Sequence, residues 1–121
     1  MSAFGYILRM PYVYILECAD GTYYVGSTRD LDLRLAQHQL GQGAAYTRRT
    51  GRRPVTLRWH AEFERMDDAF LWEKQIQGWS HAKRTLLMEE GFEAVRGWSR
   101  RQRAAKRADG AASDIEGEAT G

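Results

Sequence analysis

The sequence predicts one small α/β domain of the α+β kind, in which helices flank a three-stranded, mixed or antiparallel sheet in the order β-β-α-β-α-α. Three observations lead to this prediction. The chain has 121 residues, of which 43% are hydrophobic, so it can build one modest core but not two. A turn signal separates two strand-like runs near the N-terminus. A third run alternates between apolar and polar residues, and segments with helical spacing follow it.

A β-hairpin is predicted near the N-terminus. Residues 12–18 and 22–26 are rich in tyrosine, valine and isoleucine, which favour strands. The dipeptide Asp20-Gly21 between them is typical of a tight turn. The two strands therefore pair with each other.

The register of this hairpin decides which of its side chains share a face. A two-residue loop would place Tyr14 and Tyr24 on opposite faces. A three-residue loop, with Gly21 in the left-handed region and a β-bulge, would place Leu16 opposite Tyr24 and both tyrosines on one face. The local pattern leaves both registers open.

A helix is predicted over residues 30–40. Its leucines at positions 31 and 35 share a face, and Gly41 is a typical stop signal. Arg34 and His38 are four residues apart, so both side chains project from one side of this helix. The candidates for its N-cap are Ser27, Thr28 and Asp30.

The Gly-rich stretch at residues 41–54 is predicted to be a loop. Five arginines fall within eleven residues of this region, with no acid between them, and such a cluster could meet phosphate groups. A solvated loop that only aids solubility explains the cluster equally well. The five are Arg48, Arg49, Arg52, Arg53 and Arg58.

A third strand and a further helix are predicted next. Apolar and polar residues alternate over residues 55–63, as in a half-buried strand. Asp67 or Asp68 then caps a helix through residues 68–79. Glu73 borders the apolar stripe of this helix, which places a carboxylate partly inside the fold. The stripe consists of Ala69, Trp72, Ile76 and Trp79.

Ser80 is a candidate N-cap for a helix over residues 81–90 that ends at Gly91. Beyond about residue 98 no periodic apolar face is found, which is typical of disorder. The predicted organisation is an N-terminal extension at residues 1–9, a domain at residues 10–98 and a disordered, basic-then-acidic tail at residues 99–121.

Several classes of protein are excluded by composition. Cys18 is the only cysteine, so there is no disulfide framework, and no cluster of Cys and His has the spacing of a zinc site. No apolar run approaches the roughly 20 residues that span a bilayer, and the N-terminus lacks the features of a signal peptide. These patterns predict a cytoplasmic protein.

The chemistry-bearing residues form an unusual set. The sequence contains no G-x-S-x-G, P-loop, G-x-G-x-x-G or H-E-x-x-H motif. The set that remains suits displacement at phosphorus in nucleic acid, which needs a base for water, a cation for charge on the phosphoryl oxygens and a carboxylate for a divalent metal. Its members are Tyr14, Tyr24, Arg34, His38 and Glu73.

The chain resembles the GIY-YIG nuclease superfamily, and within it the small stand-alone bacterial members. The resemblance runs from about residue 11 to residue 88. As a set its motifs are specific, although either tripeptide alone is weak. They are Tyr-Val-Tyr at 12–14, Tyr-Val-Gly at 24–26, RDLDLRLAQH at 29–38 and WEKQI at 72–76.

The resemblance implies a metal-dependent DNA endonuclease that uses one divalent ion, Mg²⁺ or Mn²⁺. Tyr14 and Tyr24 match two tyrosines of the family's active site, and this favours the three-residue loop because both hydroxyls must reach one site. Arg34 matches an arginine that faces the scissile phosphate, and His38 a histidine of some members. Glu73 matches the metal ligand. The candidate nucleic-acid contacts are Tyr46, Arg48, Arg49, Arg52, Arg53 and Lys83.

The mechanism implied by the resemblance assigns each residue a role. Glu73 holds the ion on the leaving-group side, and Arg34 neutralises charge on the non-bridging oxygens. Tyr14, helped by Tyr24 or His38, accepts a proton from the attacking water. The pKa of a free tyrosine is about 10, so the nearby cation and metal would have to lower the pKa of Tyr14.

Two alternatives differ in class from a nuclease. The chain contains no asparagine, whereas many members of the family use one after the metal-binding glutamate. This favours a catalytically inactive nucleic-acid-binding module of the same fold. Against that alternative, a module that only binds phosphate does not need the negative charge of Glu73. The second alternative is a protein-interaction domain that uses Trp98 and the basic tail.

Overall fold

The computed structural model describes the backbone of residues 10–120 and the side chains of residues 10–108. Residues up to Arg84 form one compact unit, and residues from Thr85 onward form a second. The extension predicted at residues 1–9 lies outside the described residues. The domain boundary expected at residue 98 stays a prediction.

The order of elements in the first unit confirms the β-β-α-β-α-α prediction, with one short helix, α3, added. The unit ends inside α5, and α6 belongs wholly to the second unit. Along the chain the elements are β1 (Tyr12–Glu17), β2 (Tyr23–Thr28), α2 (Leu31–Gln39), α3 (Ala45–Arg48), β3 (Thr56–Glu62), α4 (Met66–Gln77), α5 (His81–Glu90) and α6 (Phe92–Thr120).

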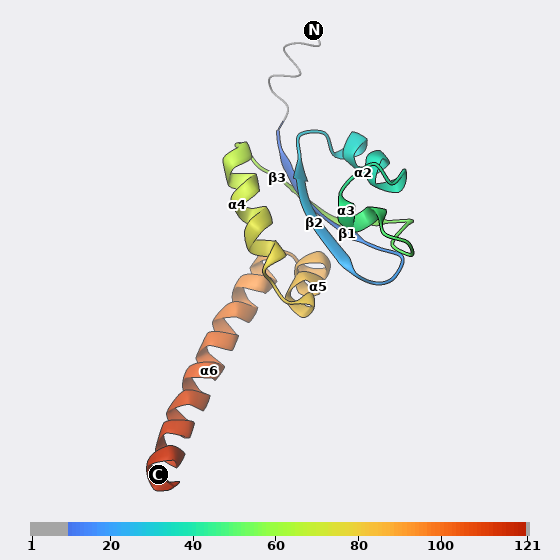
Figure 1. Ribbon diagram of the computed structural model, residues 1–121. Coiled ribbons are helices and arrows are strands. Elements are labelled where there is room, and N and C mark those ends of the chain that lie inside the picture. Colours follow the sequence, from blue (N-terminus) through green and yellow to red (C-terminus); the bar gives the residue numbers. More distant parts are fainter. Residues whose placement is uncertain (1–9, 121) are drawn as a thin grey trace. The chain divides into compact units, whose positions relative to one another are not determined.

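The sheet is antiparallel, with the strand order β2-β1-β3. Figure 1 shows α2 and α3 on one side of the sheet and α4 on the other. β3 alternates between half-buried and exposed side chains, as the sequence predicts. Central strand β1 is buried over Val13, Tyr14, Ile15 and Leu16, because helices cover both of its faces.

The hairpin has the three-residue loop. Leu16 lies opposite Tyr24, which puts Tyr14 and Tyr24 on one face. Gly21 has a φ of +84°, a backbone conformation that L side chains rarely adopt. The loop closes because the backbone N–H of Cys18 donates to the carbonyl oxygen of Thr22 at 2.8 Å. The register that brings both tyrosines to one place is therefore confirmed.

The core on the α2 side of the sheet is partly aromatic. Its buried members are Tyr14, Leu16, Cys18 and Val55. Tyr24 and Tyr46 pack against them, together with the leucines at positions 31, 35 and 57. The two site tyrosines are thus also core residues, so their positions are fixed by packing.

Most of the predicted caps are present. The Asp30 carboxylate accepts a hydrogen bond from the N–H of Leu33 at 3.1 Å at the start of α2. The Ser80 hydroxyl accepts one from the N–H of Lys83 at 3.1 Å at the start of α5. Gly41 follows α2 with a φ of +76°.

Three expectations differ from the structure. Residues 45–48 of the expected loop form a single helical turn, α3. α4 begins at Met66, and its N-cap position is Arg65. Asp67 and Asp68 therefore lie in the first turn, where their negative charges stabilise the helix by interacting with the positive end of its dipole, and neither is the N-cap. Residues 99–120, expected to be disordered, continue α6. Alanine, arginine and lysine favour this helix locally even where its side chains are exposed.

Candidate active site

Four of the predicted site residues meet where the hairpin faces α2. The ring centroids of Tyr14 and Tyr24 are 6.3 Å apart, and the His38 ring lies 5.8 Å from the first and 5.1 Å from the second. Arg34, one turn before His38, lies close enough to both tyrosine hydroxyls to act toward a lower pKa of each. Neighbouring strands and a helix thus converge on one polar cluster inside an otherwise apolar core.

A chain of short hydrogen bonds runs through His38, whose side chain is fully buried. Its Nε2 lies 2.8 Å from the Tyr14 hydroxyl oxygen. Its Nδ1 lies 2.8 Å from the hydroxyl oxygen of Thr47, a buried residue of α3. The Thr47 hydroxyl in turn donates to the carbonyl oxygen of Ala44 at 3.1 Å. Thr47 was not predicted from the sequence, because nothing in the sequence pattern distinguishes it within its Gly-rich segment.

Two glycines leave the space that this chain of hydrogen bonds needs. A Cβ at Gly26 would lie 2.5 Å from the hydroxyl oxygen of Tyr14 and 2.9 Å from a ring carbon of Tyr24. A Cβ at Gly43 would lie 2.5 Å from Nδ1 of His38. Any side chain at either position would displace a buried ring. The glycine that ends the Tyr-Val-Gly motif is therefore required by the tyrosine opposite it.

Without a metal, the pKa of Tyr14 is shifted away from the direction that a base would need. Burial raises the pKa of Tyr14 well above its usual value, and the nearby Tyr24 hydroxyl and Glu73 carboxylate add to this. Arg34 acts in the opposite direction but is outweighed. Burial also raises the pKa of Tyr24. The tyrosine hydroxyls of the metal-free protein therefore keep their protons at neutral pH, because the desolvation cost exceeds the effect of one cation.

Glu73 projects from α4 toward β2 and is 9% exposed. The Ser27 hydroxyl of β2 donates to its Oε1 at 2.5 Å. The Gln77 amide donates to its Oε2 at 2.8 Å and also to the carbonyl oxygen of Val25 at 3.1 Å. Ser27 and Gln77 were not singled out by the sequence analysis, although Gln77 stands one turn after Glu73. They hold the carboxylate at the strand that also carries Tyr24.

The donor set around Glu73 suits a hard divalent cation. Among the side chains of residues 10–108, no group of three or more His, Cys, Asp or Glu could hold a metal. Mg²⁺ does not need such a group, because it commonly binds through one or two carboxylates and takes its other oxygens from water and substrate phosphate. Glu73 supplies the carboxylate and Ser27 a hydroxyl oxygen. The residues present therefore fit one magnesium or manganese ion.

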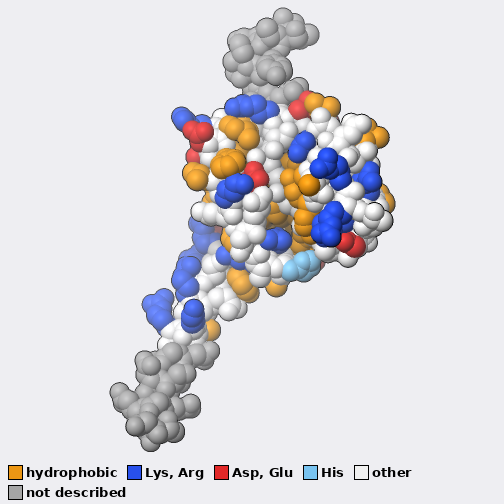
Figure 2. Space-filling model, in the orientation of Figure 1, with side chains coloured by type: hydrophobic (Ala, Val, Ile, Leu, Met, Phe, Trp, Pro, Cys, Tyr) orange, Lys and Arg blue, Asp and Glu red, His pale blue; other side chains and the backbone are white. Residues whose placement is uncertain are grey.

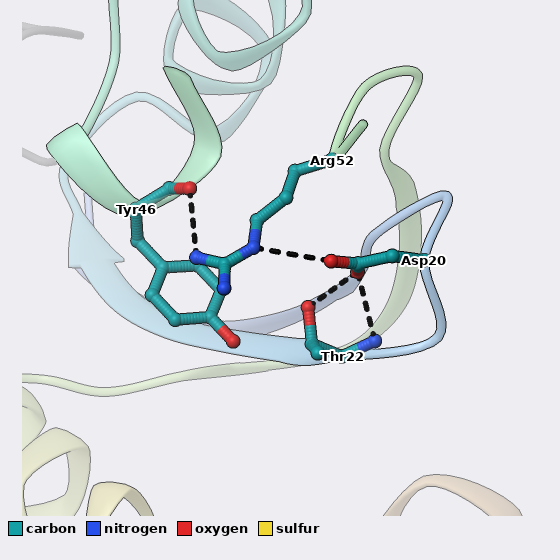
Figure 3. A network of polar contacts seen from close by, with 4 residues as sticks. All are labelled: Asp20, Thr22, Tyr46 and Arg52. Atoms are coloured by element: carbon teal, nitrogen blue, oxygen red, sulfur yellow. Dashed lines mark hydrogen bonds and ion pairs between the residues drawn. The ribbon is translucent and has the colours of Figure 1, made fainter. Parts of the chain in front are cut away.

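The predicted basic patch is partly neutralised. Arg52 pairs with Asp20 of the hairpin loop at 3.2 Å, stacks over the Tyr46 ring at 3.7 Å and donates to the Tyr46 carbonyl oxygen. Figure 3 shows this network, in which Thr22 also binds Asp20. Arg58 pairs with Glu17 of β1 at 3.1 Å. The acids come from β1 and its turn, so the charge count of residues 48–58 alone could not reveal them.

The other three arginines of this patch face solvent. Arg48, Arg49 and Arg53 are exposed. Figure 2 shows Lys and Arg side chains gathered on the part of the surface that carries α2 and α3. Arg52, by contrast, fastens α3 to the hairpin.

A hollow of about 260 Å³ adjoins the cluster. It lies beside Tyr24 and includes Gln77, the partner of Glu73. Lys83 is not among its lining residues, and its ammonium lies 4.3 Å from the Trp79 ring centroid. Half of the lining residues are aromatic, and the full set is Tyr23, Tyr24, Val25, Tyr46, Gln77 and Arg84. Like Gln77, Arg84 was missed by the sequence analysis.

The buried state of His38 predicts a pH dependence of stability. Burial, aided by the charge of Arg34, lowers the pKa of His38 from 6.5 to about 4. Between these values the unfolded chain binds a proton that the folded chain does not, so stability is complete above pH 6.5 and falls as the pH drops toward 4. We expect the free energy of unfolding to fall by up to about 3 kcal/mol more in wild type than in His38→Gln.

Urea unfolding at pH 7, 5.5 and 4 measures this difference. His60→Gln, at an exposed position of β3, is the matched control and should keep the wild-type pH dependence because His38 is intact. Equal losses in wild type and His38→Gln would contradict the assignment of a neutral, buried His38.

No helix within residues 10–120 has the length and apolar character needed to cross a membrane. The model of the GIY-YIG catalytic domain matches residues 10–86, more than half of the chain. A UPF0213 protein of Halobacterium salinarum is 46% identical over 78 residues, which cover 64% of this chain and 99% of that protein. A UPF0213 protein of Bacillus pumilus is 44% identical over 79 residues, covering 65% and 79% of the two chains.

A solved structure was also found. The solution NMR structure of a UPF0213 protein from Bacillus halodurans has 36% sequence identity and a TM-score of 0.44, and covers 72% of this chain and 93% of that one. The family match and the sequence relatives together settle the membership. The protein belongs to the GIY-YIG family, and it is similar to the small UPF0213 proteins of bacteria and archaea.

Proposed function

We propose that the protein is a metal-dependent endonuclease that hydrolyses phosphodiester bonds in DNA. One observation carries the proposal: the Tyr14 hydroxyl is hydrogen-bonded to the neutral imidazole of His38, and the Arg34 guanidinium and the Glu73 carboxylate are both close enough to act on the pKa of the same hydroxyl. A structural cluster would not need a carboxylate and an arginine at one edge of a buried aromatic core. Hydrolysis at phosphorus needs this combination.

The proton of the attacking water passes to the Tyr14–His38 pair. Tyr14 accepts it through its hydroxyl oxygen while it gives its own proton to Nε2 of His38, 2.8 Å away. Tyr14 therefore never has to exist as a free phenolate, which burial makes unfavourable. The Tyr24 hydroxyl helps to orient the phosphate together with Arg34, which lies close enough to act on its pKa.

Arg34 neutralises the charge that develops on the non-bridging oxygens. It is only half-buried, so its guanidinium can donate outward as well as to Gln37, 3.1 Å away. A phosphate bound there also cancels part of the charge that lowers the pKa of His38, which makes the imidazole a better proton acceptor when substrate is present. A divalent ion held by Glu73 would supply charge stabilisation for the leaving 3′ oxygen.

Binding of the nucleic acid relies on charge and stacking. The exposed Arg48, Arg49 and Arg53 contact the backbone, and Tyr46 presents its ring to the hollow beside Tyr24. Nucleotides flanking the scissile bond can stack on such rings. Because backbone contacts dominate, we expect weak and salt-sensitive binding with little sequence preference.

Cleavage of labelled single-stranded, duplex, flap and four-way-junction DNA tests the proposal. Each substrate is incubated with Mg²⁺, with Mn²⁺ and with excess EDTA, beside an RNA of the same sequence. Metal-dependent cutting of at least one DNA, abolished by EDTA, is the expected result. Binding without cutting under every condition would overturn the proposal in favour of an inactive nucleic-acid-binding module.

A further inference from the structure

We propose that Thr47 is a positioning residue that holds His38 in the one tautomer able to take the proton of Tyr14. Its importance for catalysis rests on the proposed nuclease function, whereas the tautomer itself is a property of the folded chain. The proposal follows from the direction in which each hydrogen bond of the buried chain must run.

The direction is fixed at one end by a carbonyl group. The Thr47 hydroxyl has one proton, and it donates that proton to the carbonyl oxygen of Ala44, which can only accept. Its oxygen must then accept from Nδ1 of His38, 2.8 Å away, so Nδ1 carries the imidazole proton. Nε2 is left with a lone pair and faces the Tyr14 hydroxyl.

The other end of the chain does not fix a direction by itself. The Tyr14 hydroxyl, 2.8 Å from Nε2 of His38, can either donate its proton to this nitrogen or accept one from it. Because Nδ1 carries the imidazole proton, Nε2 has only a lone pair, and Tyr14 must donate. The tautomer that Thr47 imposes is therefore the one that can take the proton of Tyr14.

The surroundings of His38 prevent other arrangements of these hydrogen bonds. His38 and Thr47 are fully buried, so water cannot replace either partner. Gly43 lies against the imidazole, and a ring flip would put carbon atoms where the two nitrogens stand, so both hydrogen bonds would be lost. The Ala44 carbonyl is held at the start of α3, where it also accepts from the N–H of Arg48 at 3.2 Å. α3 therefore places the Thr47 hydroxyl next to Nδ1 of His38.

The tautomer can be measured without any assay of cleavage. Two-dimensional ¹⁵N NMR of the imidazole distinguishes a protonated nitrogen from one with a lone pair. At pH 7 we expect Nδ1 of His38 to be protonated in wild type and in Thr47→Ser, which keeps the hydroxyl. In Thr47→Val, which keeps the shape but not the hydroxyl, the population should shift toward protonated Nε2. A proton on Nε2 in wild type, or an unchanged tautomer in Thr47→Val, would overturn the proposal.

Kinetics then test the catalytic consequence. Thr47→Val should lower kcat by at least about tenfold with little change in KM, because a wrongly held proton-transfer residue affects the reaction more than binding. Thr47→Ser should restore most of the rate. In a His38→Ala background, Thr47→Val should cause no further loss, since it acts only through the imidazole.

The matched control is Thr50→Val, the same change at an exposed threonine nearby, which should alter neither the spectrum nor kcat. A loss in Thr47→Val that persists undiminished in the His38→Ala background would show a merely structural role and refute the proposal. If wild type cuts no substrate, the proposed function fails, and the ¹⁵N spectra alone still decide whether Thr47 holds the tautomer.

Discussion

Glu73→Gln is expected to abolish metal-dependent cleavage, with a loss in kcat on the order of 10³-fold or more, equivalent to about 4 kcal/mol of transition-state stabilisation. Glutamine has nearly the same size and can still accept the hydrogen bond from Ser27. It lacks the negative charge that a divalent ion requires. The variant should therefore stay folded and keep its affinity for DNA, and it should lose the ion together with the activity.

Three measurements test this expectation. Calorimetric titration with Mn²⁺ reports the loss of the ion, cleavage reports the loss of activity, and thermal unfolding reports the state of the fold. Glu64→Gln is the control, because it makes the same substitution at an exposed position of the first unit. Cleavage by Glu73→Gln at the wild-type rate would refute the assignment of Glu73 as the metal ligand.

The second large effect is expected for Arg34→Ala, with a fall in kcat of about 10²- to 10³-fold. The guanidinium is the cation that acts on the pKa of both tyrosine hydroxyls, and in the proposed reaction it donates to the phosphate as charge develops. Arg34→Lys should recover only part of the rate, because an ammonium cannot reach two hydroxyls and a phosphate in one plane.

A readout independent of cleavage accompanies this variant. The charge of Arg34 is the second cause, after burial, of the lowered pKa of His38. Removing it should raise the pKa of His38, and an NMR titration of the imidazole measures the shift. Arg29→Ala, which removes an exposed arginine just before α2, should leave both the pKa and kcat unchanged. A normal kcat together with an unshifted pKa of His38 in Arg34→Ala would show that Arg34 is not part of the site.

Individual residues explain which parts of the fold were predictable. Asp20-Gly21 and the strand formers around it specify the hairpin through local backbone preferences, and Gly21 has the positive φ that the three-residue loop needs. The caps at Asp30 and Ser80 are likewise local signals and were found. The burial of Glu73 followed from its place beside an apolar stripe at helical spacing.

Other features depend on partners that lie far away in the sequence. Arg52 is read locally as part of a basic cluster, but Asp20 and Tyr46 hold it in place. The raised pKa of Tyr14 in the metal-free protein could not be foreseen, because the sequence indicates a cation nearby but not the burial that outweighs it. Thr47 gains its partner only when α3 packs against α2.

By itself, the sequence determined the order of the elements, the hairpin, the family and the residue types available for chemistry, because these follow from spacing, turn residues and motifs along the chain. The tertiary structure alone decided that Tyr14, His38 and Thr47 form one chain of hydrogen bonds and that Ser27 and Gln77 hold Glu73. The physical reason is that hydrogen-bond direction and desolvation depend on which groups share a buried space. That space forms only when the helices close over the two faces of the sheet.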